Sequence, residues 1–120
     1  MQQAHIDLRY VLRGLGYRGG LKACEKQLGV NRGELEDVDG YTAVLLWANY
    51  TRSGNAHALE TLLAYNTEDV INLEVLMVLA YNRFLAQTPF SSTLQLASPQ
   101  LPPVPYRIDR ETLMRVTCYV

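Results

Sequence analysis

The sequence predicts a mainly α-helical chain that ends in a proline-rich extended tail. Apolar residues recur at helical spacing through residues 6–87. All five prolines fall within residues 88–106, together with several serines and few helix-forming residues, so we expect an extended connector on the surface. With 120 residues, of which 48% are hydrophobic and 19% charged, the chain has the composition of one small globular domain.

Charge, cysteine content and the first residues restrict the environment and the partners. The net charge of −1 gives no general attraction to nucleic acid or to acidic membranes, so nucleic-acid binding would require local positive patches or bound metal. Cys24 and Cys118 match no metal-ligand spacing and are predicted to be free thiols in a reducing cytosol. No signal-peptide pattern opens the sequence and no apolar run approaches ~18 residues, which predicts a soluble, cytoplasmic protein without a membrane partner.

Helix boundaries are indicated by capping residues and glycines. Asp7 and Asn55 are suited to begin helices, because short polar side chains accept hydrogen bonds from the free N–H groups of a first turn. Gly29 and Gly54 lie where helical periodicity stops, and glycine commonly ends helices. We therefore expect helices at about residues 8–15, 21–28, 41–51, 56–63 and 67–86.

The long helix expected at 67–86 is apolar on most of its sides. Val70, Leu73 and Met77 lie on one face. Val75 and Val78 widen the apolar sector well beyond one stripe. A helix of this kind needs neighbours on most of its surface, which favours association with a complementary chain or with a second copy.

The structure of residues 106–120 is open between two alternatives. Asp109 with Thr112 and Leu113 would begin a short helix. The alternation of apolar and polar residues from Met114 onward would instead suit a strand.

The spacing of Tyr65 and Asp69 points to chemistry. On a helix, residues four apart share a face, so this phenol and this carboxylate would point at one spot. A carboxylate holds a divalent cation and a phenolic hydroxyl orients water on it, as in phosphodiester hydrolysis by two metals. An ordinary helix joint is the alternative. In that case Asn66 would cap the long helix and Tyr65 would pack on Val70, with Asp69 in the first turn.

Four blocks of the sequence, in order, resemble the C-terminal half of the YprB-like ribonuclease H-like domain. The blocks are H-I-D-L-R, G-G-L-K-A-C-E-K-Q-L-G-V, D-G-Y-T-A-V-L-L-W-A-N-Y and A-L-E-T-L-L-A-Y-N-T-E-D-V-I-N-L-E-V-L, and they cover about residues 5–86. This family is similar to the DnaQ-like 3′–5′ exonucleases, which carry a D-E-D-D set of metal ligands. The resemblance implies that residues 1–87 form the later, helical part of a ribonuclease H-like α/β fold, followed by a connector and a short element at 88–120.

The resemblance also implies roles for individual residues. In the tyrosine-bearing branch the final motif reads Y-x-x-x-D, which falls on Tyr65 and Asp69. Asp69 would be the last metal-binding carboxylate, for Mg²⁺ or Mn²⁺, and Tyr65 would position the attacking water. Glu68 and Asn66 match the family's usual neighbours and are expected to give local support. The implied activity is metal-dependent 3′–5′ exonucleolytic hydrolysis of DNA or RNA.

The sequence departs from the family's pattern at two of its metal motifs. The acidic pair D-x-E has no counterpart before His5, and the second motif's aspartate is missing too. The acids of residues 34–40 lie in a loop, and Asp7 matches a recurrent position that is not a ligand. One carboxylate binds Mg²⁺ poorly, because this ion keeps its waters unless several oxygens converge. We therefore expect the isolated chain to be inactive: an excised fragment, a truncated product, a subunit completed by another chain, or a non-catalytic helical interaction module.

The basic residues near the first turn have two interpretations. Arg9, Arg13 and Lys22 are candidate contacts for nucleic-acid phosphates, together with Arg18. A solvated helix face explains the same residues.

The aromatic residues of the third helix and the two histidines are also open. Trp47 and Tyr50 would stack on bases or, as the alternative, pack in and around the core. His5 and His57 have no partner at metal-ligand spacing, so surface or hydrogen-bonding roles are expected.

Overall fold

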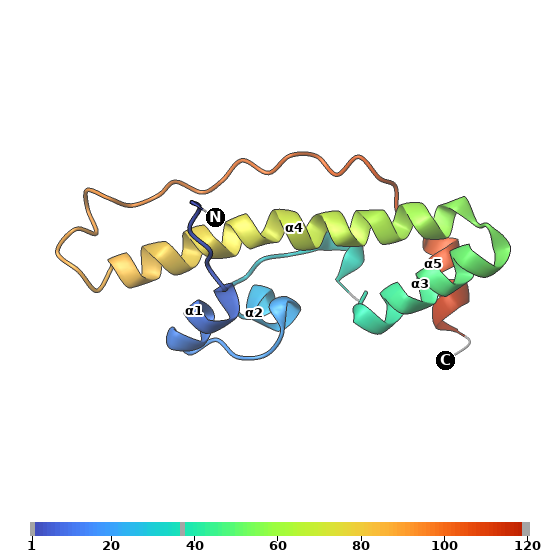
Figure 1. Cartoon of the computed structure of the whole chain (residues 1–120), viewed down its shortest axis with the longest axis horizontal. Coiled ribbons are helices and arrows are strands. Elements are labelled where there is room, and N and C mark those ends of the chain that lie inside the picture. Colours follow the sequence, from blue (N-terminus) through green and yellow to red (C-terminus); the bar gives the residue numbers. More distant parts are fainter. Residues whose placement is uncertain (1, 37, 119–120) are drawn as a thin grey trace. The chain divides into compact units, whose positions relative to one another are not determined.

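The computed structural model describes residues 2–36 and 38–118, and within these ranges every regular element is a helix. In chain order they are α1 (Leu8–Gly14), α2 (Leu21–Gln27), the 3₁₀ turn η1 (Gly33–Leu35), α3 (Gly40–Ser53), α4 (Ala56–Leu85) and α5 (Arg110–Thr117) (Figure 1). The prediction of a mainly α-helical chain is confirmed. No helix in the described ranges is long and apolar enough to span a bilayer.

Several helix ends coincide with the residues that the sequence indicated. The Asp7 carboxylate accepts a hydrogen bond from the backbone N–H of Arg9 at 3.0 Å, which confirms the cap of α1. At the start of α4, Oδ1 of Asn55 accepts a hydrogen bond from the N–H of His57 at 3.1 Å. Gly54 ends α3 with φ 69°, a left-handed conformation that residues with a Cβ rarely adopt.

The helix α4 is continuous over 30 residues, so the expected joint at Asn66 is wrong. Asn66 lies exposed in the middle of this helix, where it caps nothing, and Tyr65 does not precede a helix start. The physical reason is packing, because buried side chains recur along α4 both before and after residue 66. These side chains are Ala58, Thr61, Ala64, Asn72, Leu76, Val78 and Ala80. Ending the helix at residue 66 would disturb this packing, which stabilises a helix more than local propensity does.

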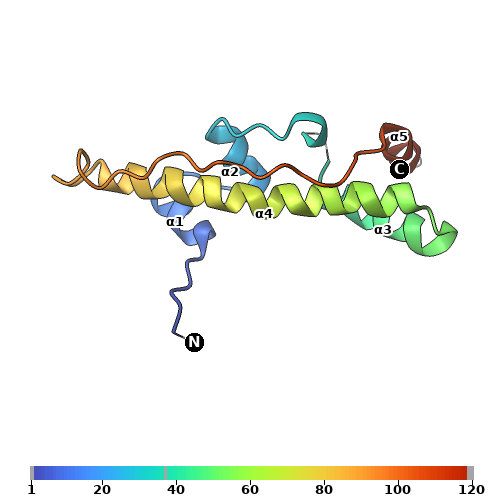
Figure 2. The same ribbon diagram turned by 90° about the horizontal axis from the view of Figure 1, so that it is seen from above.

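The chain divides into two compact units, and the first, unit 1, comprises Met1–Asn31 and Ile71–Leu101. Its core brings together Leu12 of α1, Cys24 of α2, and Leu76 with Ala80 of α4. Figure 1 shows α1 and α2 both beneath this part of α4, and in the turned view of Figure 2 they lie on either side of its ribbon. Unit 1 is therefore a small helical cluster built on the C-terminal half of α4.

The tail that follows α4 is extended, as its proline content predicts, and side-chain amide hydrogen bonds anchor it within unit 1. The N–H of Leu96 donates to Oδ1 of Asn82 at 2.9 Å, and Nδ2 of Asn82 donates to the carbonyl of Leu96 at 2.8 Å. The Tyr81 hydroxyl donates to the carbonyl of Leu94 at 3.1 Å. These bonds satisfy backbone groups of a segment that pairs with no strand in the described ranges.

The second unit, unit 2, comprises Arg32–Val70 and Pro102–Val120. One core cluster joins α3, α4 and α5 through Leu46, Ala58 and Val116. A further cluster joins α4 to the η1 segment, by which we mean η1 and the residues up to the start of α3. The buried members of this cluster are Leu35, Val38 and Ala64. The η1 segment is thus held against α4 by apolar packing.

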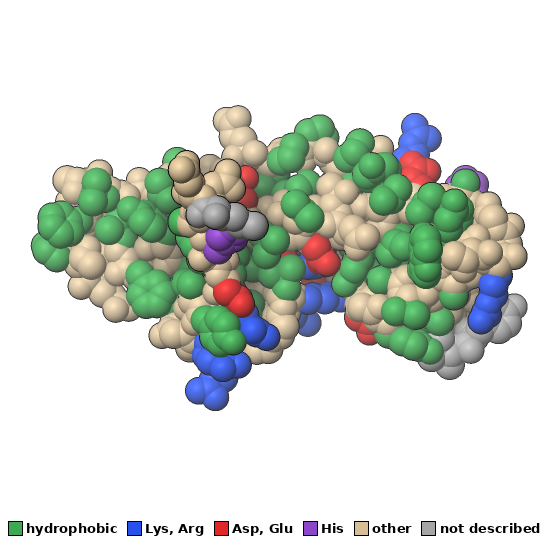
Figure 3. Space-filling model, viewed as in Figure 1, with side chains coloured by type: hydrophobic (Ala, Val, Ile, Leu, Met, Phe, Trp, Pro, Cys, Tyr) green, Lys and Arg blue, Asp and Glu red, His purple; other side chains and the backbone are tan. Residues whose placement is uncertain are grey.

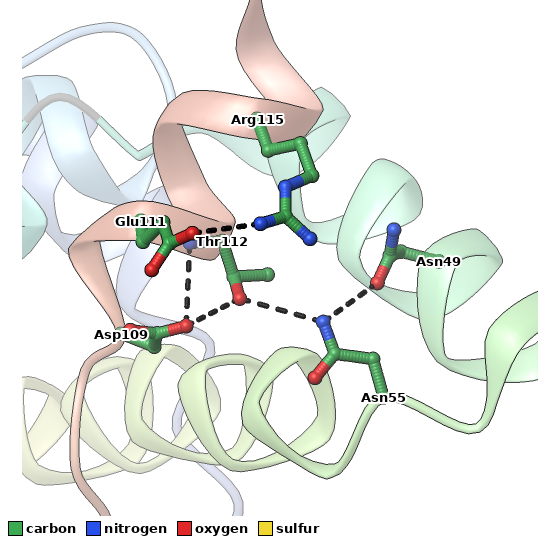
Figure 4. A network of polar contacts seen from close by, with 6 residues as sticks. All are labelled: Asn49, Asn55, Asp109, Glu111, Thr112 and Arg115. Atoms are coloured by element: carbon green, nitrogen blue, oxygen red, sulfur yellow. Dashed lines mark hydrogen bonds and ion pairs between the residues drawn. The ribbon is translucent and has the colours of Figure 1, made fainter.

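Of the two alternatives for residues 106–120, the structure has the helix, α5, at Arg110–Thr117, and residues 119–120 lie outside the described residues. Asp109 caps it by accepting a hydrogen bond from the N–H of Thr112 at 3.3 Å. The N–H of Asp109 donates to Oγ1 of Thr61 in α4 at 2.9 Å. Nδ2 of Asn55 donates to the Thr112 hydroxyl at 3.4 Å and to Oδ1 of Asn49 at 3.1 Å (Figure 4). This polar network fastens α5 to α3 and α4.

Candidate functional site

Tyr65 and Asp69 lie one helical turn apart on the part of α4 that belongs to unit 2. Because α4 is unbroken at these positions, the two side chains project from the same face of the helix. Both are partly buried, and the Asp69 side chain is 33% exposed. The face is therefore accessible without being fully solvated.

The ionic partner of Asp69 is Arg32, a residue that the sequence analysis did not identify. Nη2 of Arg32 lies 2.6 Å from Oδ1 of Asp69, and the arginine side chain is only 1% exposed. The guanidinium carbon lies 5.6 Å from the centre of the Tyr65 ring. A buried cation requires a nearby negative charge, because its desolvation penalty is several kcal/mol. Arg32 and Asp69 thus neutralise each other beside Tyr65.

The Tyr65 hydroxyl is held in its neutral form. Burial raises its pKa above the ordinary value of 10.0, and the negative charges of Asp69 and Asp39 raise the pKa further. The Arg32 guanidinium opposes this through its charge and a hydrogen bond, but the net pKa stays raised. A neutral phenol donates and accepts hydrogen bonds, so it can orient water at neutral pH without acting as a base.

Two of the loop acids of residues 34–40, Glu36 and Asp39, interact with Arg32 or Tyr65. Asp39 lies close enough to Tyr65 to raise its pKa, and it also caps α3. Its Oδ1 accepts hydrogen bonds from the N–H of Thr42 at 2.8 Å and from the Thr42 hydroxyl at 3.0 Å. Oε2 of Glu36 accepts a hydrogen bond from the N–H of Arg32 at 3.4 Å. Asp37 lies outside the described residues.

The donor set around Asp69 does not fit a divalent metal by itself. Among residues 2–36 and 38–118, no three or more His, Cys, Asp or Glu side chains are grouped so that they could hold a metal ion. Asp69 provides one carboxylate, and a guanidinium already contacts it. Mg²⁺ requires several converging oxygens. Any metal at this position would need further ligands from outside the described residues.

Three of the four basic residues near the first turn meet at one hollow of unit 1. The hollow is lined by Arg9, Arg13, Tyr17, Arg18 and Gly19. Figure 3 shows Lys and Arg side chains gathered around α1. Lys22, on α2, does not line this hollow. The structure thus brings together three of the four predicted contacts, which are Arg9, Arg13 and Arg18, and leaves Lys22 outside the hollow.

The remaining predicted residues divide between core and surface. Tyr50 packs against the core cluster that contains Leu46, whereas Trp47 is 52% exposed. The centroids of the Trp47 and Tyr50 rings lie 5.7 Å apart. His5 and His57 are both exposed. Free thiols are present at both cysteines, Cys24 being buried and Cys118 exposed.

Comparison with protein families decides the affiliation of the chain. A family model described as RNase_H superfamily matches residues 1–81 of the 120. The chain belongs to the RNase H superfamily. No curated protein and no solved structure matches it significantly.

Membership in the RNase H superfamily confirms the predicted ribonuclease H-like domain. The helical structure is consistent with the C-terminal helical part of an RNase H-like fold. At a coarse level the chain is nuclease-like, and RNase H-like domains generally bind nucleic acids and use divalent metals. The YprB-like branch and the roles of Tyr65 and Asp69 stay predictions.

Proposed function

We propose that this RNase H-like chain supplies the helical part of a metal-dependent 3′–5′ exonuclease-like domain of the YprB-like, tyrosine-bearing branch. Its substrates are phosphodiesters of DNA or RNA in the cytoplasm. One observation carries the proposal: Tyr65 and Asp69 share a face of the unbroken α4, and the Arg32 guanidinium lies against them. The Arg32 guanidinium balances the charge of the Asp69 carboxylate, so a metal ion at this face would have to displace that pairing and would need further carboxylates.

In a completed domain Asp69 would hold a metal ion, and Tyr65, as a neutral phenol, would orient the attacking water. The raised pKa of Tyr65 supports orientation by hydrogen bonding over proton abstraction. By itself the chain is expected to be inactive, because its one carboxylate at this face is paired with Arg32. The remaining carboxylates would come from a complementary chain or from a longer form of this chain.

Cleavage by a completed domain tests the proposal. The chain is expressed in continuity with any segment encoded directly upstream of Met1 that carries D-x-E and a further aspartate. Release of nucleotides from a 3′-labelled oligonucleotide is then measured with Mg²⁺ or Mn²⁺. Asp69→Asn should abolish cleavage while circular dichroism shows the helices intact. Glu74→Gln, which changes an exposed acid of the same helix, should cleave like the unmodified protein. Full activity of the Asp69→Asn protein would rule out the assignment.

A non-catalytic interaction module is the second candidate, and exposed apolar side chains favour it. In unit 1 a largely apolar hollow is lined by residues of α1 and α4, among them Phe84, together with Ile6. Ile6 is 62% exposed and Phe84 40% exposed. Contiguous exposed apolar surface commonly marks a protein-binding site. Size-exclusion chromatography with light scattering tests this candidate, and a monomer at all concentrations with no bound partner counts against it.

A further inference from the structure

The two units carry formal charges of opposite sign. Unit 1 contains six Lys and Arg against three Asp and Glu, a formal charge of +3. Unit 2 contains five Lys and Arg against nine Asp and Glu, a formal charge of −4. The whole-chain charge of −1 hides this contrast. A polyanion is therefore attracted by unit 1 and repelled by unit 2.

Three of the six basic residues of unit 1 line a hollow of about 540 Å³, and no acidic side chain is in its lining. Arg9, Arg13 and Arg18 are all exposed there. A guanidinium group binds phosphate oxygens through two parallel hydrogen bonds, so each of the three can hold a backbone phosphate. Asp7 lies 3.6 Å from Arg9, but both side chains are more than half exposed, and an ion pair of this kind is weak.

Two tyrosines lie beside these cations. The guanidinium of Arg9 lies 4.8 Å from the centre of the Tyr10 ring, and that of Arg13 lies 6.0 Å from it. Tyr10 is 59% exposed. The Tyr17 ring, inside the hollow, has the guanidinium of Arg83 at 5.5 Å. Exposed aromatic rings beside phosphate-binding cations are typical of sites that hold unpaired bases, whereas the bases of a duplex are already stacked on one another.

We infer that this hollow, together with the exposed Tyr10 ring beside Arg9 and Arg13, binds single-stranded nucleic acid. The three arginines bind backbone phosphates and Tyr10 stacks on a base. The inference takes its partner class from the proposed function and narrows the substrate to single strands. Binding at this hollow requires neither a metal ion nor Tyr65 and Asp69. Binding and cleavage can therefore be measured in separate experiments.

Fluorescence anisotropy of labelled oligothymidine and oligouridine with the full chain in EDTA tests the arginines. The variant Arg9→Gln/Arg13→Gln/Arg18→Gln should bind at least about tenfold more weakly at moderate salt. The slope of log affinity against log salt should fall by about 2, because each phosphate contact on a single strand contributes about 0.7. The matched control Arg52→Gln/Arg107→Gln/Arg115→Gln removes the same charge from exposed positions of unit 2 and should bind like the unmodified chain.

A further variant separates base stacking from charge. Tyr10→Ala should weaken binding about fivefold or more without changing the salt slope. A duplex of the same length should bind more weakly than either single strand. Equal affinity of the unmodified chain and the triple unit 1 variant, an equal loss in the unit 2 control, or tighter binding of the duplex would each overturn the inference.

The cleavage residues provide the remaining comparison. Asp69→Asn should bind the oligonucleotides like the unmodified chain even though it is expected to lose cleavage in a completed domain. Binding that persists while Asp69 proves dispensable for cleavage refutes the nuclease assignment and leaves this site intact. Binding that is insensitive to the three arginines refutes this site and leaves the cleavage test unaffected.

Discussion

Arg32 and Asp69 form an ion pair in which the cation is buried and the carboxylate is one-third exposed, with 2.6 Å between Nη2 and Oδ1. The pair links the segment just before η1 to the middle of α4. Such an asymmetric pair is sensitive to the loss of its acid, because the buried arginine then loses the Asp69 counter-charge. The same pairing takes up the carboxylate that the proposed metal site would use.

Asp69→Asn should lower the free energy of unfolding by roughly 2–3 kcal/mol. This is below the ~3–5 kcal/mol typical of a broken buried pair, since Asp69 is partly solvated. Arg32→Met/Asp69→Asn should be more stable than Asp69→Asn alone, because the buried charge is removed as well. Urea denaturation of the single and double variants measures both effects.

The exposed pair of Arg115 with Glu111, at 2.8 Å, is the control for that experiment. Glu111→Gln should change the free energy of unfolding by less than ~0.5 kcal/mol, because exposed ion pairs contribute little. A loss at Asp69→Asn no greater than that at Glu111→Gln would contradict the buried pairing.

The pKa of Tyr65 should respond in opposite directions to its two charged neighbours. Asp69→Asn removes a negative charge that raises this pKa and leaves Arg32 in place, so the pKa should fall. Arg32→Gln removes the charge that lowers it, so the pKa should rise. NMR of tyrosine labelled at Cζ follows the titration, and Tyr65→Phe assigns the resonance.

The raised pKa of Tyr65 also has a consequence for stability at high pH. A group whose pKa is raised on folding contributes stability that is fully present below its unfolded value of 10.0, and this contribution is lost as the pH rises through the folded value. The difference in stability between the unmodified chain and Tyr65→Phe should therefore change above pH 10. A difference that stays constant there would contradict burial of this hydroxyl.

The Asp109 cap of α5 should make the docking of this helix sensitive to acid. The hydrogen bond from Thr112 holds the pKa of Asp109 below its ordinary value of 3.8. A carboxyl with a lowered pKa contributes stability above its unfolded value, and this contribution is lost as the pH falls through the folded value. Asp109→Ala should lower Tm at pH 7, and the gap to the unmodified chain should close below pH 3.8. Thermal unfolding at several pH values measures the gap, and an unchanged gap in acid would refute the cap.

Core and surface positions of unit 2 should differ sharply in their response to truncation. Leu46 is fully buried between α3, α4 and α5, so Leu46→Ala should lower the free energy of unfolding by about 2–5 kcal/mol. Val70 is 68% exposed, so Val70→Ala should change it by no more than about 0.5 kcal/mol. Urea denaturation compares the two, and a large loss at Val70 would mean that this side chain is covered in solution.

The sequence by itself determined the helical class, the extended tail and most helix ends. Asp7 and Asn55 cap helices by accepting hydrogen bonds from N–H groups two residues ahead, and Gly54 ends one through its own backbone conformation. These interactions are local, so a short window of residues contains all the information that they require. The shared face of Tyr65 and Asp69 is not set by such local interactions alone, because it requires the helix to continue through Asn66, where the sequence also allowed a joint.

The tertiary structure alone decided that α4 continues through Asn66 and that Asp69 meets Arg32. A cap at Asn66 is locally reasonable, but continuous burial along α4 outweighs it. The burial of Arg32 depends on η1 packing through Leu35 on Ala64, residues that are distant in the chain. Sequence periodicity does not encode this contact. A buried ion pair forms where packing excludes water, and the spacing of its two residues along the chain does not determine where that happens.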